Sequence, residues 1–528
     1  MQGLVVRNGM SMDTNRKNFT LNLLGQVLVF IINMVIGLFL TPCIVDALGT
    51  EAYGYIGIIN NLISYLSVLT TSLNALAGRY ITISYLKDDK KETNEYFTSV
   101  FFSNVVLGIS IFVLSILLSV KLEALIHIPE HLVVDVKIAF VLAAVSSSIS
   151  LLSVVWGVAA FIKNKLYLNS FAQVVAGIVR IVLLLVLFTF FTPRVLSYSL
   201  GGVVSGFIVL VIELLITRKI LPGISIKRTY FSFKKVVELI KSGIWVSFQS
   251  LNKILQTGLD LFITNIFVDT ISTGLFSIAK QIPVVLNQIP ALLANIFNPS
   301  LARLYVKEQK DELVQHLNFT MKFLTFVMVV PLIGFVVFGD NFYALWLPNH
   351  SSNEIATIQL LSVLTVLPCL FDAYVQGLYY INVLTNKIRD SVLITFAFSV
   401  MSIVTEIVLL LATDLNPLMV IAATSSVFVS VRYLIVTPIY CAYILEIHKY
   451  TFFKQLIKSI VTSVVVFVLF YLTKKVLIID TWVSFLTSIF VIGIVGYLVV
   501  FLITFTMVEK KKVLTMLKLD RILKRGSK

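Results

Sequence analysis

The stretch VDALGTEAYGYIGI, Val45 to Ile58, lies between two long apolar segments and is more polar than either. Its acids, Asp46 and Glu51, raise the question of whether it is an active-site loop or a turn between membrane helices. No convergent nucleophile, base or metal-ligand set accompanies them, so we predict an external turn. A second copy, VDTISTGLFSI, begins at Val268 and indicates a repeated architecture.

The repeat extends beyond the turn. Asp46 and Asp269 are 223 residues apart, and the same spacing relates other polar positions. The further matched pairs are Gln26 with Gln249, Asn33 with Gln256, and, one residue out of step, Asn74 with Asn298 and Arg79 with Arg303. Both copies start at a predicted cytoplasmic helix end. The repeat is therefore parallel, as in transporters built from two equivalent lobes related by an axis along the membrane normal.

The composition identifies a membrane protein. Of the 528 residues, 58% are hydrophobic and 13% are charged, with a mean hydropathy of +0.96, whereas soluble domains are about 45–50% apolar and about 25% charged. The apolar runs are continuous for about twenty residues, which predicts spanning helices and excludes a β-barrel. We predict an all-α polytopic protein with about fourteen spans, starting near Asn18, Gly54, Tyr96, Val136, Asn169, Leu196, Gly243, Leu275, Phe319, Ile355, Ser391, Pro417, Ser459 and Trp482.

The basic residues orient these spans. Of the 42 Lys and Arg residues, the predicted external loops hold only Lys121, Lys137, Arg194, Lys474 and Lys475. Cytoplasmic loops are enriched in Lys and Arg, so this bias predicts that both termini are cytoplasmic. It also explains the net charge of +15 without a nucleic-acid partner.

The repeat and the spans predict four regions. Residues 1–217 form an N-lobe of helices 1–6, and 218–243 form a cytoplasmic amphipathic linker. Residues 244–446 form a pseudo-symmetric C-lobe of helices 7–12, and 447–528 add helices 13 and 14 and a basic cytoplasmic tail. The linker and the tail are amphipathic and basic, which is typical of ordinary interfacial helices beside anionic lipid.

Polar residues within the spans are the candidate site, because such residues are expensive in a membrane and usually face a cavity or a partner helix. In helix 7 the residues Gln249, Lys253, Gln256 and Asp260 recur at helical spacing, which predicts one wet face. The predicted substrate-binding residues are Lys253, Lys280, Arg180, Arg432, Gln249, Gln256, Gln26 and Asn33. We consider Asp260 and Asp372 as binders of a coupling H⁺ or Na⁺.

The sequence gives little support to a metal site, a redox site or a nucleotide site. A single membrane Asn or Gln more often links helices than binds a substrate. Cys43, Cys369 and Cys441 match no metal or redox spacing, and Pro129 interrupts the helix that would align His127 with His131. There is no Gly-Lys dipeptide, hence no P-loop. We therefore predict no catalytic residue, no metal and no cofactor beyond the coupling ion.

Together, the segment NLLGQVLVFIINMVIGLFLTPCIVDALGTEAYGYIGI (22–58), the two-lobe repeat and the fourteen spans resemble the Wzx-type polysaccharide and O-antigen flippases of the multidrug/oligosaccharidyl-lipid/polysaccharide exporter superfamily. The turn in that family typically reads Leu-Gly-x-x-x-Tyr-Gly, which Leu48, Gly49, Tyr53 and Gly54 match. The resemblance implies translocation of undecaprenyl-pyrophosphate-linked oligosaccharides from the inner to the outer leaflet of the bacterial cytoplasmic membrane, for surface polysaccharide biosynthesis. It also implies membrane lipids and polysaccharide polymerase machinery as partners.

Two alternatives stay open. A multidrug exporter of the same superfamily would favour acidic and aromatic cavity residues for cationic drugs, in contrast to the basic set in these spans. A membrane polysaccharide polymerase would need larger extramembrane loops than this chain offers.

Overall fold

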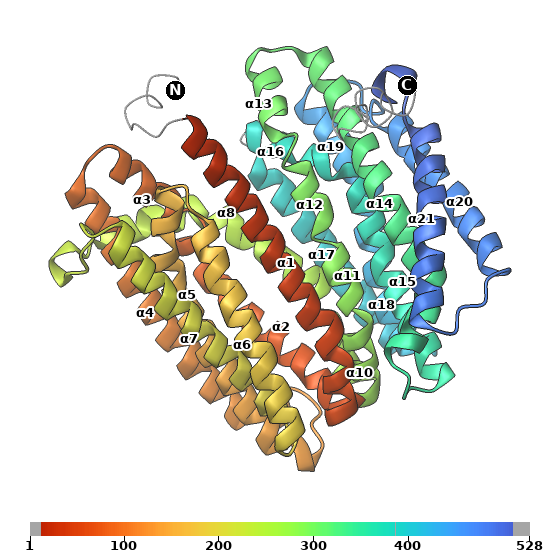
Figure 1. The fold of residues 1–528 in the computed structure, drawn as a ribbon, viewed down its shortest axis with the longest axis horizontal. Helices are drawn as coiled ribbons and strands as arrows, with labels where there is room; N and C mark the ends of the chain where they lie inside the picture. The colour runs from red at the N-terminus through yellow and green to blue at the C-terminus, as the bar shows by residue number, and fades with distance from the viewer. Residues whose placement is uncertain (1–11, 386, 511–528) are drawn as a thin grey trace. The chain divides into compact units, whose positions relative to one another are not determined.

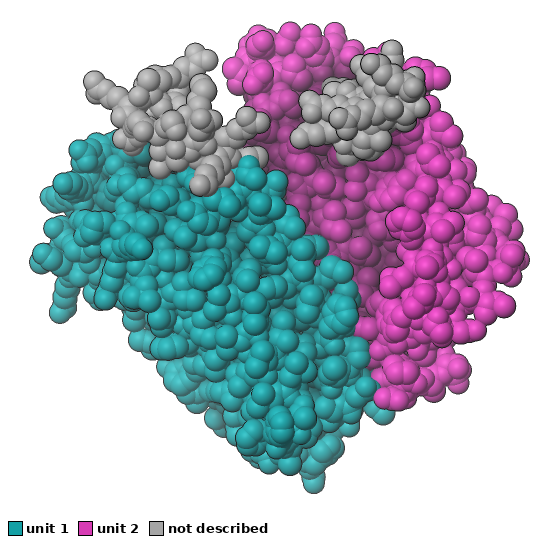
Figure 2. Space-filling view, viewed as in Figure 1, with its two compact units in different colours: residues 1–277 teal, residues 278–528 magenta. Residues whose placement is uncertain are grey.

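The structure, a computed structural model, describes residues 12–385 and 387–510. Within these ranges all regular secondary structure is helical (Figure 1). The chain divides into two compact units, residues 1–277 and 278–528, which Figure 2 colours separately. The basic tail predicted at the C-terminus lies outside the described residues from 511 onward.

Unit 1 contains ten α-helices, the last of which ends two residues inside unit 2. They are α1 (Met12–Leu48), α2 (Thr50–Asn74), α3 (Ala77–Leu86), α4 (Lys90–Val120), α5 (Val133–Ile162), α6 (Tyr167–Phe190), α7 (Val195–Ile220), α8 (Phe233–Thr257), α9 (Leu259–Phe267) and α10 (Thr270–Ala279). Short 3₁₀ turns, η1 (Leu122–Ala124), η2 (Glu130–Leu132) and η3 (Arg228–Tyr230), lie in the connections.

The described part of unit 2 begins with three short helices and continues with long helices between which shorter ones lie. They are α11 (Gln281–Leu286), α12 (Ile289–Ala294), α13 (Asn298–Val306), α14 (Lys310–Trp346), α15 (Ser352–Val375), η4 (Gln376–Leu378), α16 (Tyr379–Leu384), α17 (Ile388–Ala412), α18 (Pro417–Val431), the π-helical turn η5 (Arg432–Val436), α19 (Thr437–Ile444), α20 (Phe453–Lys474) and α21 (Trp482–Thr504). In the apolar 18-residue window of α14, 67% of residues are buried, against 33% or less in the other candidate spans of the described chain. Helix α14, which packs on α15, α20 and α21, is therefore the core of unit 2.

All fourteen predicted spans coincide with a helix or a run of consecutive helices, which confirms an all-α polytopic fold. Among the described residues, eleven helical segments are long and apolar enough to cross a membrane, and α2 with α3 makes a twelfth if that bent pair is one span. The remaining two predicted spans, helices 7 and 8, are broken into α8–α9 and α10–α13.

The turn at Val45 is confirmed. Helix α1 ends at Leu48 and α2 begins at Thr50, and Gly49 between them has a φ of +85°. A left-handed φ is accessible to glycine at no steric penalty, which accounts for the glycine of the Leu-Gly pair. The second copy is also a turn, because α9 ends at Phe267 and α10 begins at Thr270.

The predicted linker differs from the structure at its end. Helix α8 starts at Phe233 and continues without interruption past Gly243, where helix 7 was predicted to begin. Its residues Val236 and Leu239 are buried in a cluster with Phe97 and Val100 of α4, so this part of the amphipathic segment packs on protein. Gly243 permits close approach, since a Cβ atom there would lie 1.9 Å from the backbone oxygen of Ser72.

An ion pair fixes the start of α8. The Lys235 Nζ lies 2.6 Å from Glu92 Oε1 of α4 and donates to Tyr96 Oη at 3.1 Å. Burial alone would lower the pKa of Lys235, but Glu92 and Tyr96 hold it above its ordinary value. Lys235 therefore stays charged at neutral pH and is held in its contacts with Glu92 and Tyr96.

The two compact units do not coincide with the predicted lobes. Packing joins α8, α9 and most of α10 to the N-terminal helices, chiefly through α8 on α2. The lobes were defined by the repeat in the sequence, and their boundaries stay a prediction.

Candidate functional site

The predicted site residues are distributed over both units. Unit 1 holds Gln26 and Asn33 on α1, Arg180 on α6, Gln249, Lys253 and Gln256 on α8, and Asp260 on α9. Unit 2 holds Lys280, Asp372 and Arg432. Within each unit, the residues that are most enclosed lie beside interruptions of helices.

The first interruption separates α8 from α9 at Gly258. The backbone oxygen of Gly258 accepts hydrogen bonds from Asn61 Nδ2 at 2.9 Å and from Tyr65 Oη at 2.8 Å, both on α2. Gly258 is the N-cap of α9, and side-chain hydrogen bonds between membrane helices commonly hold such positions in place. The polar residues of α2 thus stabilise the break in helix 7.

The break changes the predicted polar face of helix 7. Gln249 and Lys253 are exposed and Gln256 is half-buried, all on α8, whereas Asp260 lies beyond the break and is buried. The predicted stripe is therefore interrupted between Gln256 and Asp260, and its four residues differ in burial. Asp260 lies close enough to Tyr65 to act on its hydroxyl electrostatically.

Helix 8 is interrupted repeatedly, and Lys280 lies at its first break. This lysine, 9% exposed, separates α10 from α11. The backbone oxygen of Ala279 accepts a hydrogen bond from Ser362 Oγ of α15 at 2.8 Å. Pro290 near the start of α12 and Pro299 near the start of α13 lack the amide N–H that a continuous helix uses. The predicted helix 8 is therefore divided among short helices.

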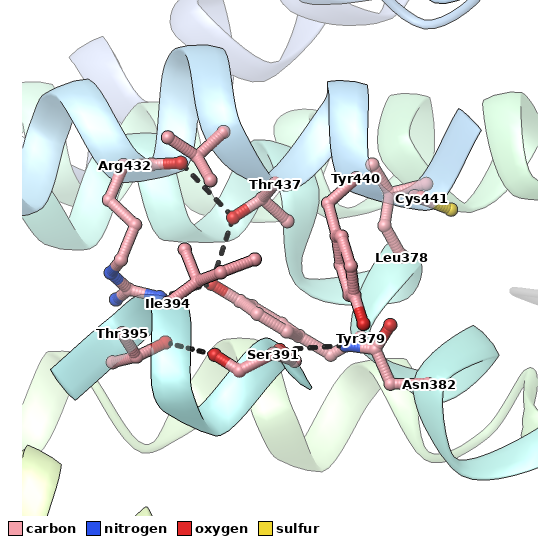
Figure 3. Close-up of a pocket in the computed structure, with 11 residues that line it drawn as sticks. Leu378, Tyr379, Asn382, Ser391, Ile394, Thr395, Arg432, Thr437, Tyr440 and Cys441 are labelled. Atoms are coloured by element: carbon pink, nitrogen blue, oxygen red, sulfur yellow. Dashed lines mark hydrogen bonds between the residues drawn. The ribbon is translucent and has the colours of Figure 1, made fainter. Parts of the chain in front are cut away.

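The guanidinium of Arg432 lies in a small pocket of unit 2 (Figure 3). Arg432 is 6% exposed, and its Nη1 donates to Tyr379 Oη at 3.0 Å. Its Cζ lies 4.2 Å from the centre of the Tyr433 ring, a cation–π distance. Some of the other lining residues carry a hydroxyl or amide group, namely Asn382, Ser391, Thr395, Thr437 and Tyr440. The rest, Leu378, Ile394, Val436 and Cys441, are apolar.

The backbone around Arg432 departs from the α-helix. Residues Arg432–Val436 form a π-helical turn, and Thr437 Oγ1 donates to the backbone oxygen of Arg432 at 3.1 Å. Such turns often occur at functional sites. The pocket has a volume of about 20 Å³, enough for a water molecule or for one oxygen of a larger anion.

Asp372 shares this environment. It lies on α15, is 7% exposed, and acts electrostatically on Arg432, Tyr379 and Tyr433. When the side-chain amide of Gln376 is oriented with its nitrogen toward Asp372, that nitrogen donates to the two carboxylate oxygens at 3.0 and 3.2 Å. The structure therefore brings the predicted cation Arg432 and the predicted acid Asp372 together. Their functional roles stay predictions.

Arg180, Gln26 and Asn33 lie on α6 and α1, which are not interrupted. Arg180 is half-buried, with its Cζ 4.7 Å from the centre of the Tyr198 ring. Gln26 and Asn33 are exposed, and Gln26 Nε2 donates to Ser170 Oγ of α6 at 3.3 Å. This contact is of the helix-linking kind.

Sequence reasoning missed the tyrosines that hold these sites together. Tyr65 and Asn61 are four residues apart within a predicted span, a spacing that places both on one face of α2. That spacing was a usable signal. Tyr379 and Tyr433 gave none, because their role follows from the packing of helices distant in sequence.

Comparison with known proteins identifies a family and a relative that match this chain. Residues 16–305 match the model of the family described as polysaccharide biosynthesis protein. The chain is 22% identical over 496 residues, 94% of its length and 97% of the relative, to the uncharacterized membrane protein EpsK of Bacillus subtilis (strain 168).

Two solved structures share the fold. The lipid II flippase MurJ in an inward closed conformation has a TM-score of 0.65 at 14% identity, covering 92% of this chain and 97% of that one. An inward-facing multidrug resistance MATE family transporter of the MOP superfamily has a TM-score of 0.64 at 14% identity, covering 79% and 96%. The predicted resemblance is confirmed: the chain belongs to the polysaccharide biosynthesis protein family and has the fold of MOP superfamily flippases and transporters.

Proposed function

We propose that the chain is a flippase that moves undecaprenyl-pyrophosphate-linked oligosaccharide repeat units from the inner to the outer leaflet of the bacterial cytoplasmic membrane by alternating access. In this proposal both termini are cytoplasmic and the products feed surface polysaccharide biosynthesis. Membership of the polysaccharide biosynthesis family supports the substrate class, and the transporter fold supports translocation over catalysis.

One observation carries the choice of an anionic substrate: the buried guanidinium of Arg432 in a pocket lined by hydroxyl and amide groups and by apolar side chains. A guanidinium presents five N–H donors and suits phosphate oxygens. Charge-assisted hydrogen bonds offset part of the desolvation of a pyrophosphate. Hydroxyl and amide groups beside it, such as Ser391, Thr395 and Asn382, suit sugar hydroxyls. The pocket accommodates one oxygen, so we propose that it widens when the head group enters.

The interrupted helices support alternating access. Transporters often place substrate and ion sites where spanning helices are discontinuous, and the breaks at Gly258 and Lys280 are of this kind. In this proposal Lys253, Lys280 and Arg180 also contact the head group during the cycle, while Gln249, Gln256, Gln26 and Asn33 contact sugars. Asp260 beside the first break and Asp372 beside Arg432 are the proposed sites for a coupling H⁺ or Na⁺. Polysaccharide polymerase machinery is the proposed partner.

The test uses a host whose surface polysaccharide depends on this gene. The readouts are surface polysaccharide, lipid-linked repeat units retained in the cell, and the membrane level of the protein. Arg432→Gln should abolish surface polysaccharide and raise the retained intermediates, and Arg432→Lys should restore part of the output. Arg194→Gln, which changes an exposed arginine before α7, is the matched control and should behave as wild type.

Wild-type output from Arg432→Gln at a normal protein level would overturn the role of Arg432. The two alternatives predict other results. A multidrug exporter would alter resistance to cationic drugs and leave polysaccharide unchanged in a gene deletion. A polymerase would leave single repeat units at the outer surface.

A further inference from the structure

A second enclosed acid lies in unit 1, away from every residue assigned above. Glu213 of α7 is 5% exposed and faces Gly157 of α5. A Cβ atom on Gly157 would lie 3.2 Å from Glu213 Oε1 and 3.0 Å from Asn169 Nδ2 of α6. The missing side chain of Gly157 thus lets a carboxyl group and an amide enter the same space between three packed helices.

Three oxygen atoms around this space lack hydrogen-bond partners. Asn169 Nδ2 donates to the backbone oxygen of Gly157 at 2.9 Å, so the Oδ1 of Asn169 points away from that oxygen. Within the part of the chain that the structure describes, the buried atoms Asn169 Oδ1, Glu213 Oε2 and Ser153 Oγ have no partner. Ser153 lies one helical turn before Gly157 on the same face of α5. The three oxygens can all accept hydrogen bonds, but only the Ser153 hydroxyl has a proton to donate.

Among the described residues, none forms an ion pair with Glu213. The helices packed on α7 are α5, α6 and α2. Their ionisable side chains, with those of α7 itself, are Asp135, Lys137, Tyr167, Arg180, Glu51, Tyr53, Tyr55, Tyr65, Tyr198, Arg218 and Lys219. Glu213 is buried, and its Oε2 has no hydrogen-bond partner among the described residues. An isolated buried carboxylate is strongly disfavoured unless it is neutralised.

We propose that Glu213 is a proton-binding site, with its neutral carboxyl group donating a hydrogen bond to Asn169 Oδ1. One proton supplies the missing donor and removes the uncompensated charge. A metal cation fits the space less well, because it would need a shell of several oxygen ligands and only three oxygens lack a partner here. A part for this proton in driving transport rests on the proposed function.

The proton site lies near one end of its helices. Glu213 is two turns from the end of α7 at Ile220, and Asn169 is in the first turn of α6. By the distribution of basic residues, this end is cytoplasmic. The proton would therefore exchange with the cytoplasm when α5, α6 and α7 separate at that end.

The test measures the carboxylic acid directly. Infrared spectra of the purified full-length protein in nanodiscs, without substrate, report the C=O stretch of protonated carboxyl groups at about pH 7, where an ordinary Glu is ionised. Wild type should show a protonated carboxyl signal that Glu213→Gln lacks. Asn169→Leu should shift its frequency, since the acceptor is gone. Glu406→Gln, which changes a buried glutamate of α17, is the matched control and should keep the signal.

Gln has the shape of a neutral Glu, so Glu213→Gln should unfold at the wild-type temperature at about pH 4 and above it at neutral and higher pH. Above about pH 4.3 the unfolded wild type ionises Glu213, whereas the folded protein must keep the group neutral or bury its charge. An unchanged carboxyl signal in Glu213→Gln would overturn the proposal. Loss of the signal when sodium chloride replaces choline chloride would also overturn it, in favour of a sodium site. Because no transport is measured, these outcomes are independent of the polysaccharide assay.

Discussion

Gly54 of α2 and Gly274 of α10 contact each other backbone to backbone within unit 1. A Cβ atom on Gly54 would lie 2.9 Å from Gly274 N, and one on Gly274 would lie 2.1 Å from the backbone oxygen of Thr50. The two glycines come from the two copies of the repeated turn. The copies that reveal the repeat therefore also pack against each other, at a distance that only glycine permits.

This contact predicts that Gly274→Ala is destabilising. The added methyl group meets backbone, which cannot rotate away, and overpacking of this kind costs about 1–3 kcal/mol. Thermal unfolding of the purified protein should show a lower midpoint. Gly493→Ala is the control, because no atom lies within 4 Å of the new Cβ on α21. It should be neutral or stabilising by up to about 1 kcal/mol. Equal midpoints for the two variants would contradict the close approach.

The same region supplies a test of movement. Thr270 Oγ1 donates to Glu51 Oε1, so these side chains, one from each copy, are in contact at the predicted external face. If transport separates the copies, joining Glu51→Cys to Thr270→Cys with a short thiol crosslinker should stop surface polysaccharide. The protein should first carry Cys43→Ser, because Cys43 is the exposed native cysteine.

The matched control joins two residues of one predicted lobe. Lys137 Nζ lies 2.7 Å from Glu123 Oε1, and both are near the predicted external surface. Crosslinked Lys137→Cys with Glu123→Cys should leave polysaccharide output unchanged. Full output from the crosslinked 51–270 pair would show that the two copies stay together throughout transport.

The fold was largely predictable because hydropathy is a local property. The apolar runs located all fourteen helical segments, and the Leu48–Gly49 pair located a turn. The breaks in helices 7 and 8 were not predicted. The interruption at Gly258 depends on Asn61 and Tyr65, which are nearly two hundred residues away in sequence. A periodicity computed along one helix contains no such information.

The candidate site was predictable only as single residues. A charge in an apolar run is visible in the sequence, so Arg432 and Asp372 were found. Their proximity was not visible, because it requires α15 to pack on the π-helical turn. Tyr379 and Tyr433, which contact Arg432, are unremarkable among the 20 tyrosines of the chain.

The helix break predicts a non-additive pair of substitutions. Tyr65→Phe or Asn61→Leu removes one of two donors to the Gly258 oxygen, and each should destabilise by about 0.5–1.5 kcal/mol. The double variant removes both side-chain bonds between α2 and Gly258. It should lose more than the sum, because either bond alone can hold the two elements together, and a double-mutant cycle of unfolding would show this. Ser64→Ala is the control, since its hydroxyl donates to Asn60 of the same helix and not to the break. Strict additivity would mean that the two bonds act independently.

A partly buried ion pair predicts a pH effect on stability. Lys322 Nζ of α14 lies 2.7 Å from Glu509 Oε1, and the backbone and hydroxyl of Thr506 donate to Glu509 Oε2 at 2.9 Å. Burial alone would raise the pKa of Glu509, but Lys322 and Thr506 lower it below its ordinary value. A carboxyl group with a lowered pKa stabilises the folded state above its unfolded value of about 4.3, and this contribution is lost as pH falls through the folded value.

Wild type should therefore exceed Glu509→Gln by about 1–2 kcal/mol at about pH 7 and lose this advantage below about pH 4. Unfolding midpoints measured across that range check the prediction. Glu446→Gln removes a comparable carboxylate of the same unit, whose pair with Lys310 at 3.2 Å is solvent-exposed. Exposed pairs contribute little, so its midpoint should follow wild type at every pH. If the two variants lost equal stability at neutral pH, the burial of the Glu509 pair would not be the cause of its strength.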